Sequence, residues 1–439
     1  MIAAFCANCR LLPSPTAAKF MLPSGANLPA PWHSLDILDN DFAMISSLRF
    51  SVFAIFLLWT SGLAAAAQFA KIAVPFDILQ ATTYPQAGNA AGWLLTLISA
   101  LGAVLGMVAG TLVGQIGSMR ILVASLALGA ACSVWQATLP SLPVMMLSRL
   151  IEGLSHLGIV VAAPTLIAEL SPDRIRGAAL SLWSTFFGVS FALTAWFGLP
   201  LVQSAGIEAL FLVHSAIMAM LAIGLFLILR RVVPQAGIRP SLSLRRIVRE
   251  HAQSYGSPYI SAASLGWIFY TLTFVSLLTL LPPLLPYETR ATITGAMPLA
   301  SITVSLLCVP LLLTRIAAAH LVSLGFLLAV LVLALLPLGV PVGAVAIALF
   351  AMLGLVQGAT FASVPQLNAS LETRALANGT LAQMGNIGNL FGTPILLAVL
   401  IQGGAPLAFT CIAIIYALGA AVHAYLGLIR RRQGRTQGP

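Results

Sequence analysis

The sequence predicts an all-α membrane protein with about twelve transmembrane helices in two related halves of six. Two features of composition and one of pattern predict this class. Of the 439 residues, 59% are hydrophobic and only 7% are charged, whereas soluble domains are about 25% charged. The mean hydropathy is +1.01, and apolar runs of about 20 residues, the length that crosses a bilayer, recur along the chain. A lipid bilayer must therefore cover most of the surface.

The apolar runs begin after residue 43. Residues 1–43 are rich in Pro, Ser and Ala and lack a signal-peptide architecture, so they are predicted to be a disordered tail or to lie upstream of a start at Met44. The N-terminal half (44–229) and the C-terminal half (258–429) each hold six predicted spans. These are 49–71, 89–113, 121–139, 142–169, 177–203 and 206–229, then 258–283, 293–313, 318–338, 341–371, 379–402 and 404–429.

The longest polar connection, residues 230–257, separates the two halves. It is strongly basic, as is the last segment of the chain, 430–439. Cytoplasmic loops of membrane proteins carry the excess of Arg and Lys. We therefore expect both termini and the central loop to be cytoplasmic, in a bacterial inner membrane. Only Lys71 and Arg290 then fall on the outer side, with Arg149 inside a span.

The formal net charge of +10 does not indicate a nucleic-acid-binding protein. The basic residues lie in short gaps between spans rather than on one face of a soluble module. Nearly all are Arg, the exceptions being Lys19 and Lys71, a bias that we attribute to coding. Cys6 and Cys9 lack the second pair that a zinc or redox site needs. We expect a monomer with no metal or cofactor, and the chain has no Walker segment for ATP.

The fourth and tenth spans show a weak internal repeat. Residues 149–153 read Arg-Leu-Ile-Glu-Gly, and residues 354–358, at the place we take as equivalent, read Gly-Leu-Val-Gln-Gly. Each segment is followed by a proline, a short charged loop and a glycine that opens the next span. Transporters are often built from two such repeats, so this similarity supports two related halves.

With this organisation, residues 44–430 resemble the major facilitator superfamily. Residues 110–120 are similar to its motif between spans 2 and 3, residues 145–153 resemble the span-4 motif of its drug:proton antiporter branch, and residues 172–177 look like its motif between spans 4 and 5. Gly114 stands where the family has an Asp that latches the cytoplasmic side, so a weaker or different latch is expected. The gating candidates that these motifs imply are Gly110, Gly114, Gly117, Arg120, Asp173, Arg174 and Arg176.

Span 4 also carries ionisable residues within the hydrocarbon region, which costs at least about 2.5–3.5 kcal/mol each. Arg149, Glu152 and His156 lie three and four residues apart and so share one helix face. Arg149 and Glu152 can pair, which reduces that cost. The face is either a substrate-binding and proton-coupling site or a structural ion pair that fixes span 4 against its neighbours.

The resemblance implies that spans 1, 4, 7 and 10 line a central cavity. Polar and aromatic side chains on these spans are further binding candidates, although membrane aromatics more often serve packing or the interface belt. They are Gln68, Trp267, Tyr270, Gln357 and Thr360.

Glycine recurs at every fourth position of span 2, which lets two backbones approach closely. Span 11 offers a second set, and the resemblance implies that spans 2 and 11 meet across the halves, where small residues suit either sliding or static packing. The two sets are Gly102, Gly106, Gly110 and Gly114, and Gly385, Gly388 and Gly392. Polar residues on span 11, including Gln383 and Asn386, could form hydrogen bonds between helices. Asp77, after span 1, is expected to be solvated or to help close an outer gate.

These observations leave three functions open. The first is proton-coupled export of a small organic molecule, such as a drug-like compound or a siderophore, by alternating access. The second is uptake or facilitated diffusion of an organic anion, whose charge Arg149 would bind. The third, a membrane sensor or enzyme, has little support because the chain lacks H-E-x-x-H and G-x-S-x-G motifs and a soluble domain.

Overall fold

The computed structural model describes residues 32–230 and 243–436, so Cys6, Cys9 and most of the predicted tail lie outside it, as does part of the central loop. The chain divides into two compact units, residues 1–50 and 51–439, and the second is described below. Every regular element in the described ranges is helical. Eleven of these helices are long and apolar enough to cross a membrane, and the last, Thr373–Gln433, includes the two final predicted spans. The predicted all-α membrane fold is thus confirmed.

The N-terminal half contains the first ten α-helices. In chain order they are α1 (Trp32–Ala73), α2 (Phe76–Thr82), α3 (Gly92–Thr96), α4 (Ala100–Ile116), α5 (Ser118–Ala137), α6 (Leu142–Leu170), α7 (Asp173–Ser184), α8 (Phe186–Leu193), α9 (Leu199–Ala205) and α10 (Ile207–Leu229). Short 3-10 turns, η1 (Gly88–Ala91) and η2 (Leu97–Ser99), join α3 to its neighbours. The predicted second span is therefore a segmented helix.

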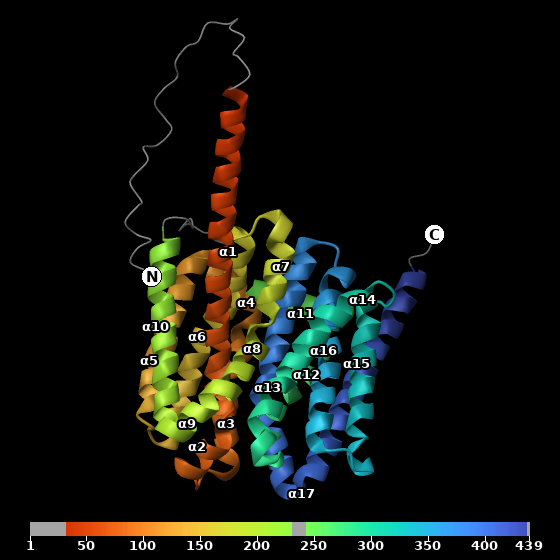
Figure 1. Ribbon diagram of the computed structural model, residues 1–439. Helices are drawn as coiled ribbons and strands as arrows, with labels where there is room; N and C mark the ends of the chain where they lie inside the picture. The colour runs from red at the N-terminus through yellow and green to blue at the C-terminus, as the bar shows by residue number, and fades with distance from the viewer. Residues whose placement is uncertain (1–31, 231–242, 437–439) are drawn as a thin grey trace, which may run out of the picture. The chain divides into compact units, whose positions relative to one another are not determined.

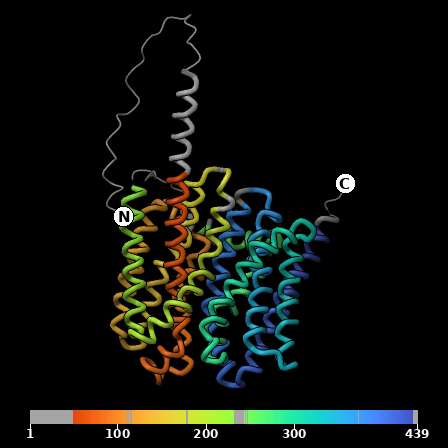
Figure 2. Tube along the Cα trace, viewed as in Figure 1, coloured from red at the N-terminus to blue at the C-terminus, as the bar shows by residue number. Residues whose placement is uncertain are grey.

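The C-terminal half follows a short basic helix of the central loop, α11 (Leu244–Gly256). Its helices are α12 (Ser261–Leu280), α13 (Tyr287–Thr303), α14 (Val309–Leu313), α15 (Ala318–Leu333), α16 (Val342–Leu367) and α17 (Leu371–Thr436), with 3-10 turns η4 (Pro282–Leu284) and η6 (Leu336–Leu338). Gly404 interrupts α17 with a φ of +67°, a conformation that glycine adopts readily. The trace of α17 reverses direction within its length (Figure 2), which separates the two final predicted spans.

Two spans contain a π-helical turn just before a proline. The turns are η3 (Thr194–Gly198), before Pro200, and η5 (Val304–Cys308), before Pro310. Proline lacks a backbone N–H, and its ring clashes with the carbonyl four residues earlier. A wider turn relieves that clash. The sequence therefore bends these two spans at defined places.

Figure 1 shows the helices up to α10 gathered as one group and those from α12 to α17 as another. The C-terminal ends of α10 and α17 lie on the same side of the array, whereas α2 and the bend of α17 lie on the opposite side. The groups meet where α4 packs against α17 and α8 packs against α13. The meeting of spans 2 and 11 is as the resemblance implied.

Candidate functional site

A fully buried ion pair lies in the fourth span, α6. The side chains of Arg149 and Glu152 are completely buried, and Arg149 Nη1 donates to Glu152 Oε2, the pairing that their spacing predicted. Arg149 Nε also donates to the carbonyl of Leu94 at 2.8 Å. This second bond joins α6 to α3, so the guanidinium has a fixed position.

Lys71 lies inside the bundle, and its predicted place on the outer side of the membrane is wrong. Its side chain is only 1% exposed. Its Nζ is 2.6 Å from Glu152 Oε1 and 2.6 Å from Ser133 Oγ. A charge near the end of a span usually extends to water. Here a carboxylate on a neighbouring helix lies within reach, and the lysine turns inward to it.

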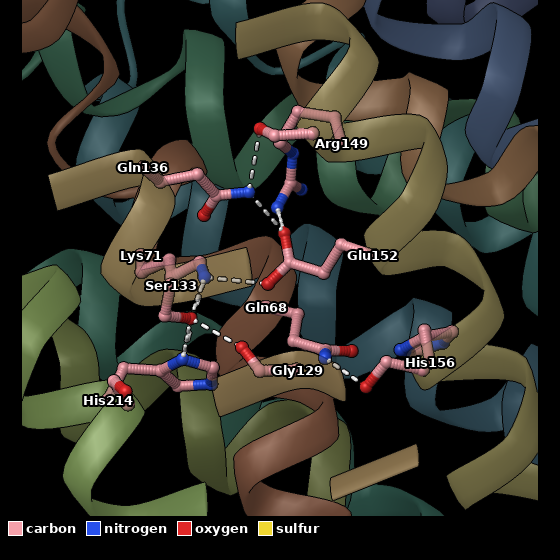
Figure 3. Close-up of polar contacts among 12 residues, drawn as sticks. Gln68, Lys71, Gly129, Ser133, Gln136, Arg149, Glu152, His156 and His214 are labelled. Atoms are coloured by element: carbon pink, nitrogen blue, oxygen red, sulfur yellow. Dashed lines mark hydrogen bonds and ion pairs between the residues drawn. The ribbon is translucent and has the colours of Figure 1, made fainter. Parts of the chain in front are cut away.

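Six residues from four helices form one polar network, here called the Glu152 cluster (Figure 3). Its members are Lys71 of α1, Ser133 and Gln136 of α5, Arg149 and Glu152 of α6, and His214 of α10. Gln136 Nε2 donates to Glu152 Oε2 at 2.8 Å. Ser133 Oγ lies 2.7 Å from His214 Nδ1. The cluster therefore ties α1, α5, α6 and α10 together.

The charges of the cluster do not cancel. Lys71 and Arg149 are cations and Glu152 is an anion, so the three sum to +1 when all are ionised. Arg149 Nη2 and Gln136 Oε1 are buried without a hydrogen-bond partner among the described residues. Buried polar atoms of folded proteins nearly always have partners. The cluster thus has unused hydrogen-bonding capacity and an excess of positive charge.

His156 and Gln68 lie beside the cluster and connect α6 with α1. His156 Nδ1 is 3.1 Å from the carbonyl of Ala65, and its ring meets Phe69 edge-on, with 5.0 Å between centroids. Gln68 Nε2 donates to Ser155 Oγ at 2.8 Å. His156 therefore shares the helix face of Glu152, as predicted, but its hydrogen bond goes to the backbone of α1.

The corresponding helices of the C-terminal half carry an uncharged polar group. Trp267 stacks on Tyr270 with 4.3 Å between ring centroids. Tyr270 donates to Gln357 Oε1 at 3.2 Å, which also accepts from Ser301 at 3.3 Å. Thr360 is buried one turn further along α16, and its hydroxyl has no partner in the described residues. Tyr270 and Gln357 are thus brought together as candidate solute contacts.

Helix packing sets the register of the internal repeat. A Cβ on Gly153 would meet the carbonyl of Ile98, and a Cβ on Gly354 would meet the carbonyl of Ser301. Both glycines therefore mark the close approach of α6 or α16 to an adjacent span. Gly153 corresponds to Gly354, and the sequence alignment of Gly153 with Gly358 is wrong by about one helical turn.

The corrected register shows how the two halves differ. The positions of Arg149 and Glu152 correspond to those of Phe350 and Leu353, which are both fully buried. Hydrophobic packing thus takes the place of the ion pair in the C-terminal half. Among the described residues, buried Lys, Arg and Glu side chains occur only in the N-terminal half.

The glycine face of α4 meets α17. A Cβ on Gly102 would collide with the side chain of Asn386, and a Cβ on Gly106 would lie 2.9 Å from Gln383 Cα. Gln383 Nε2 also donates to the carbonyl of Ala103 at 3.0 Å. The close approach that the every-fourth-glycine pattern predicted is found at Gly102 and Gly106, between the two spans that the resemblance implied would meet.

The glycines of span 11 are placed differently. Cβ atoms on Gly385, Gly388 and Gly392 would meet Trp267, Thr271 and Leu272 of α12. Their expected contact with span 2 is therefore wrong. Since 100° of helix rotation separates successive residues, residues two positions after Gln383 and Asn386 face away from α4 and pack within their own half.

The motif residues at the helix ends have structural roles. Gly117 joins α4 to α5 with a φ of +102°, which favours glycine. Arg176 Nε donates to the carbonyl of Ala168 at 3.0 Å and Arg176 Nη2 to that of Ser171 at 3.1 Å, which satisfies carbonyls at the end of α6. Arg120 and Arg174 are exposed, whereas the surroundings of Gly110, Gly114 and Asp173 lie outside the described set.

An ion pair joins the halves near α2. Arg290 Nη1 of α13 lies 3.2 Å from Asp77 Oδ2 of α2, and both side chains are partly exposed. The sequence indicated Asp77 as a gate candidate and placed Arg290 on the same side. It gave no sign that they are partners, because 213 residues separate them.

Sequence reasoning missed four members of the Glu152 cluster. Lys71 follows the predicted candidate Gln68 by three residues, so it shares a helix face with it, and that spacing was a usable signal. Ser133, Gln136 and His214 gave no comparable signal, since single polar residues in apolar spans most often form hydrogen bonds between helices.

A comparison with models of protein families identifies a family for most of the chain. A family model described as Major Facilitator Superfamily matches residues 42–371, from within α1 to the first residue of α17. No curated protein matches the chain.

Proposed function

The chain belongs to the major facilitator superfamily, and on that premise we propose that it is a proton-coupled secondary transporter that exports a small organic solute. The family match carries the general function, transport of a small solute through a bilayer by a multi-pass protein. The Glu152 cluster supports proton coupling, because buried ionisable residues in transporters commonly serve as proton relays. We place the protein in a bacterial inner membrane with both termini cytoplasmic.

The direction of transport is proposed from the sequence. Residues 145–153 resemble the span-4 motif of drug:proton antiporters, and Arg149 and Glu152 of that segment pair inside the bundle. The solute is proposed to contact the aromatic and polar group that includes Trp267, Tyr270 and Gln357, where few charges would oppose a drug-like molecule or a secreted metabolite such as a siderophore.

One observation favours a second candidate function, movement of an organic anion. The ionised cluster sums to +1, and Arg149 Nη2 is a buried donor without a described partner. A carboxylate would neutralise this charge and accept that hydrogen bond. In this case, uptake or facilitated diffusion of the anion replaces export.

Transport into proteoliposomes tests the proposal. The purified full-length protein is reconstituted, a pH gradient is imposed, and hydrophobic cations, organic anions and siderophores are screened for flux. We expect at least one compound to move against its gradient, and inverted vesicles give the direction. Anion movement without proton dependence would favour the second candidate. The absence of flux for every class would contradict the proposal.

Glu152→Gln tests the role of the cluster in coupling. We expect this variant to lose pH-driven accumulation, because removal of the carboxylate leaves Lys71 and Arg149 without their counter-charge. Glu208→Gln, at an exposed acid of α10, is the matched control and should transport normally. If Glu152→Gln shows full pH-driven transport, the Glu152 cluster takes no part in proton coupling.

A further inference from the structure

We propose that Lys71 carries the coupled proton and that Glu152 is its permanent counter-charge. This inference rests on the proton coupling proposed above and assigns the proton to one group of the cluster. Three observations support it: the scarcity of lysine relative to arginine in the chain, the hydrogen bonds of Glu152 and the contacts of Lys71 Nζ.

The first argument is the choice of lysine at this position. The chain has 21 basic residues, and all but Lys19 and Lys71 are Arg. Arginine stays protonated in proteins, whereas lysine can lose its proton. A chain that uses arginine almost everywhere thus has a lysine at the buried position beside Glu152. A releasable proton is the chemical property that arginine could not supply there.

The second argument is the surroundings of Glu152. Its carboxylate accepts from three donors: Lys71 Nζ at 2.6 Å, Gln136 Nε2 at 2.8 Å and Arg149 Nη1. A proton on Glu152 would displace one of these donors and leave two buried cations without a counter-charge. Loss of a proton from Lys71 instead leaves the neutral pair of Arg149 and Glu152. Since buried net charge is costly, charge balance favours Lys71 as the group that changes state.

The third argument is a path for the proton. His214 Nε2 lies 2.9 Å from the carbonyl of Ala64, which can only accept, so in the neutral ring Nδ1 is an acceptor. Ser133 Oγ lies between Lys71 Nζ, at 2.6 Å, and His214 Nδ1, at 2.7 Å. Ser133 Oγ also donates to the carbonyl of Gly129 at 2.9 Å. When the hydroxyl rotates from Gly129 to His214, a proton can move from Lys71 to the serine oxygen while the serine hydroxyl proton moves to His214. One Nζ–H bond breaks and one Nδ1–H bond forms.

The groups that face Lys71 come from three helices. Glu152 and Arg149 lie on α6, and Cys132 and Ser133 on α5. His214 Nδ1 of α10 lies 3.5 Å from Nζ, and the ring centroid of Phe211, also of α10, lies 5.6 Å away. Glu152 is the only acid among them, so its ion pair with Lys71 changes to an ordinary hydrogen bond when the proton leaves. The link between α1 and α6 then depends on the proton.

The lysine content of the chain allows a direct test. In Lys19→Arg, Lys71 is the only lysine, and ¹⁵N labelling of lysine gives one Nζ resonance from the full-length protein in nanodiscs. We expect this resonance to change from the ammonium to the amine form over the pH range in which the transport rate changes. Ser133→Ala should alter the rate of exchange between the two forms. An ammonium signal at every pH at which the protein stays folded would overturn the proposal.

Lys71→Arg adds a functional readout, because it keeps the positive charge and removes the releasable proton. We expect the ratio of pH-driven flux to solute exchange at equal pH to fall sharply, and Lys71→Gln, which does not enlarge the side chain, to behave likewise. A normal ratio in both variants would overturn the proposal. The resonance is measured without solute, so a titrating Lys71 without pH-driven flux contradicts the proposed function alone. A silent Lys71 with such flux contradicts this inference alone.

Discussion

At the scale of single residues, the carboxylate of Glu152 is the centre of the buried polar network. Glu152 pairs with Arg149 of its own helix and with Lys71 of α1. Sequence spacing predicted the first pair, whereas only the tertiary structure brings Lys71 to the carboxylate. Removal of one partner from a buried ion pair costs about 3–5 kcal/mol. The consequences of substitution therefore depend on the charge that remains.

This charge balance predicts an order of stability. Glu152→Gln leaves two buried cations, whereas Lys71→Gln leaves the neutral pair of Arg149 and Glu152. We expect Glu152→Gln to destabilise the protein by about 3–5 kcal/mol and Lys71→Gln to destabilise it clearly less. Thermal unfolding in one detergent measures the order, with the exposed-site variant Glu208→Gln as reference. Equal losses for the two cluster variants would show that net charge does not control stability here.

At the scale of helices, glycines mark the places where two helices come into close contact. Gly153 and Gly354 bring α6 and α16 against the backbone of adjacent spans, and Gly106 brings α4 against α17. A Cβ at the last site would lie 2.9 Å from Gln383 Cα, which is too close for backbone to yield without movement of a helix. The contact between halves at α4 therefore depends on glycine.

Enlargement of Gly106 should slow transport. We expect Gly106→Ala to strain the conformation in which α4 and α17 touch by about 1–3 kcal/mol, which shifts the conformational equilibrium by roughly 5- to 150-fold. We expect Gly106→Leu to abolish flux. Gly224 of α10 has no atom within 4 Å of an added Cβ, so Gly224→Ala is the control. Flux and expression level are measured together. Normal flux in Gly106→Leu would remove this contact from the transport cycle.

At the scale of the whole molecule, polar contacts join the halves on two sides. Near α2, Asp77 pairs with Arg290. On the side of α11, Tyr255 donates to Gln383 Oε1 at 2.7 Å, and Gln383 donates to the carbonyl of Ala103. Burial raises the pKa of the Tyr255 phenol to about 12, so it remains a donor at neutral pH. The helix of the central loop is thereby linked to both halves.

The pair of Asp77 and Arg290 is predicted to favour closure on the α2 side. A partly exposed ion pair contributes about 0.2–1 kcal/mol, so Asp77→Asn should shift the population toward separation by up to about fivefold. Spin labels at Ala81→Cys and Glu288→Cys, in a background without native cysteines, report the distance between α2 and α13. Glu208→Gln serves as control. An unchanged distance distribution in Asp77→Asn would mean that the pair does not control this side.

The sequence by itself determined the membrane class, the division into two halves, the span-4 ion pair and the glycine face of span 2. These follow from local properties, namely the length of apolar runs, the cost of buried charge and the spacing of residues on one helix. Hydropathy located the helix breaks at Gly206 and Gly404 to within a few residues, because the backbone freedom of glycine is a local property too.

Only the tertiary structure decided which distant side chains meet. Lys71 reads as a flanking charge until Glu152, 81 residues later, is brought beside it. The glycines of span 11 turn toward α12, and the internal repeat aligns through Gly153 and Gly354. Helix rotation and helix packing set both, and the sequence pattern alone does not specify them. The physical reason is that charge pairing acts through space over a few ångströms, and the chain positions that come so close are set by the packing of whole helices.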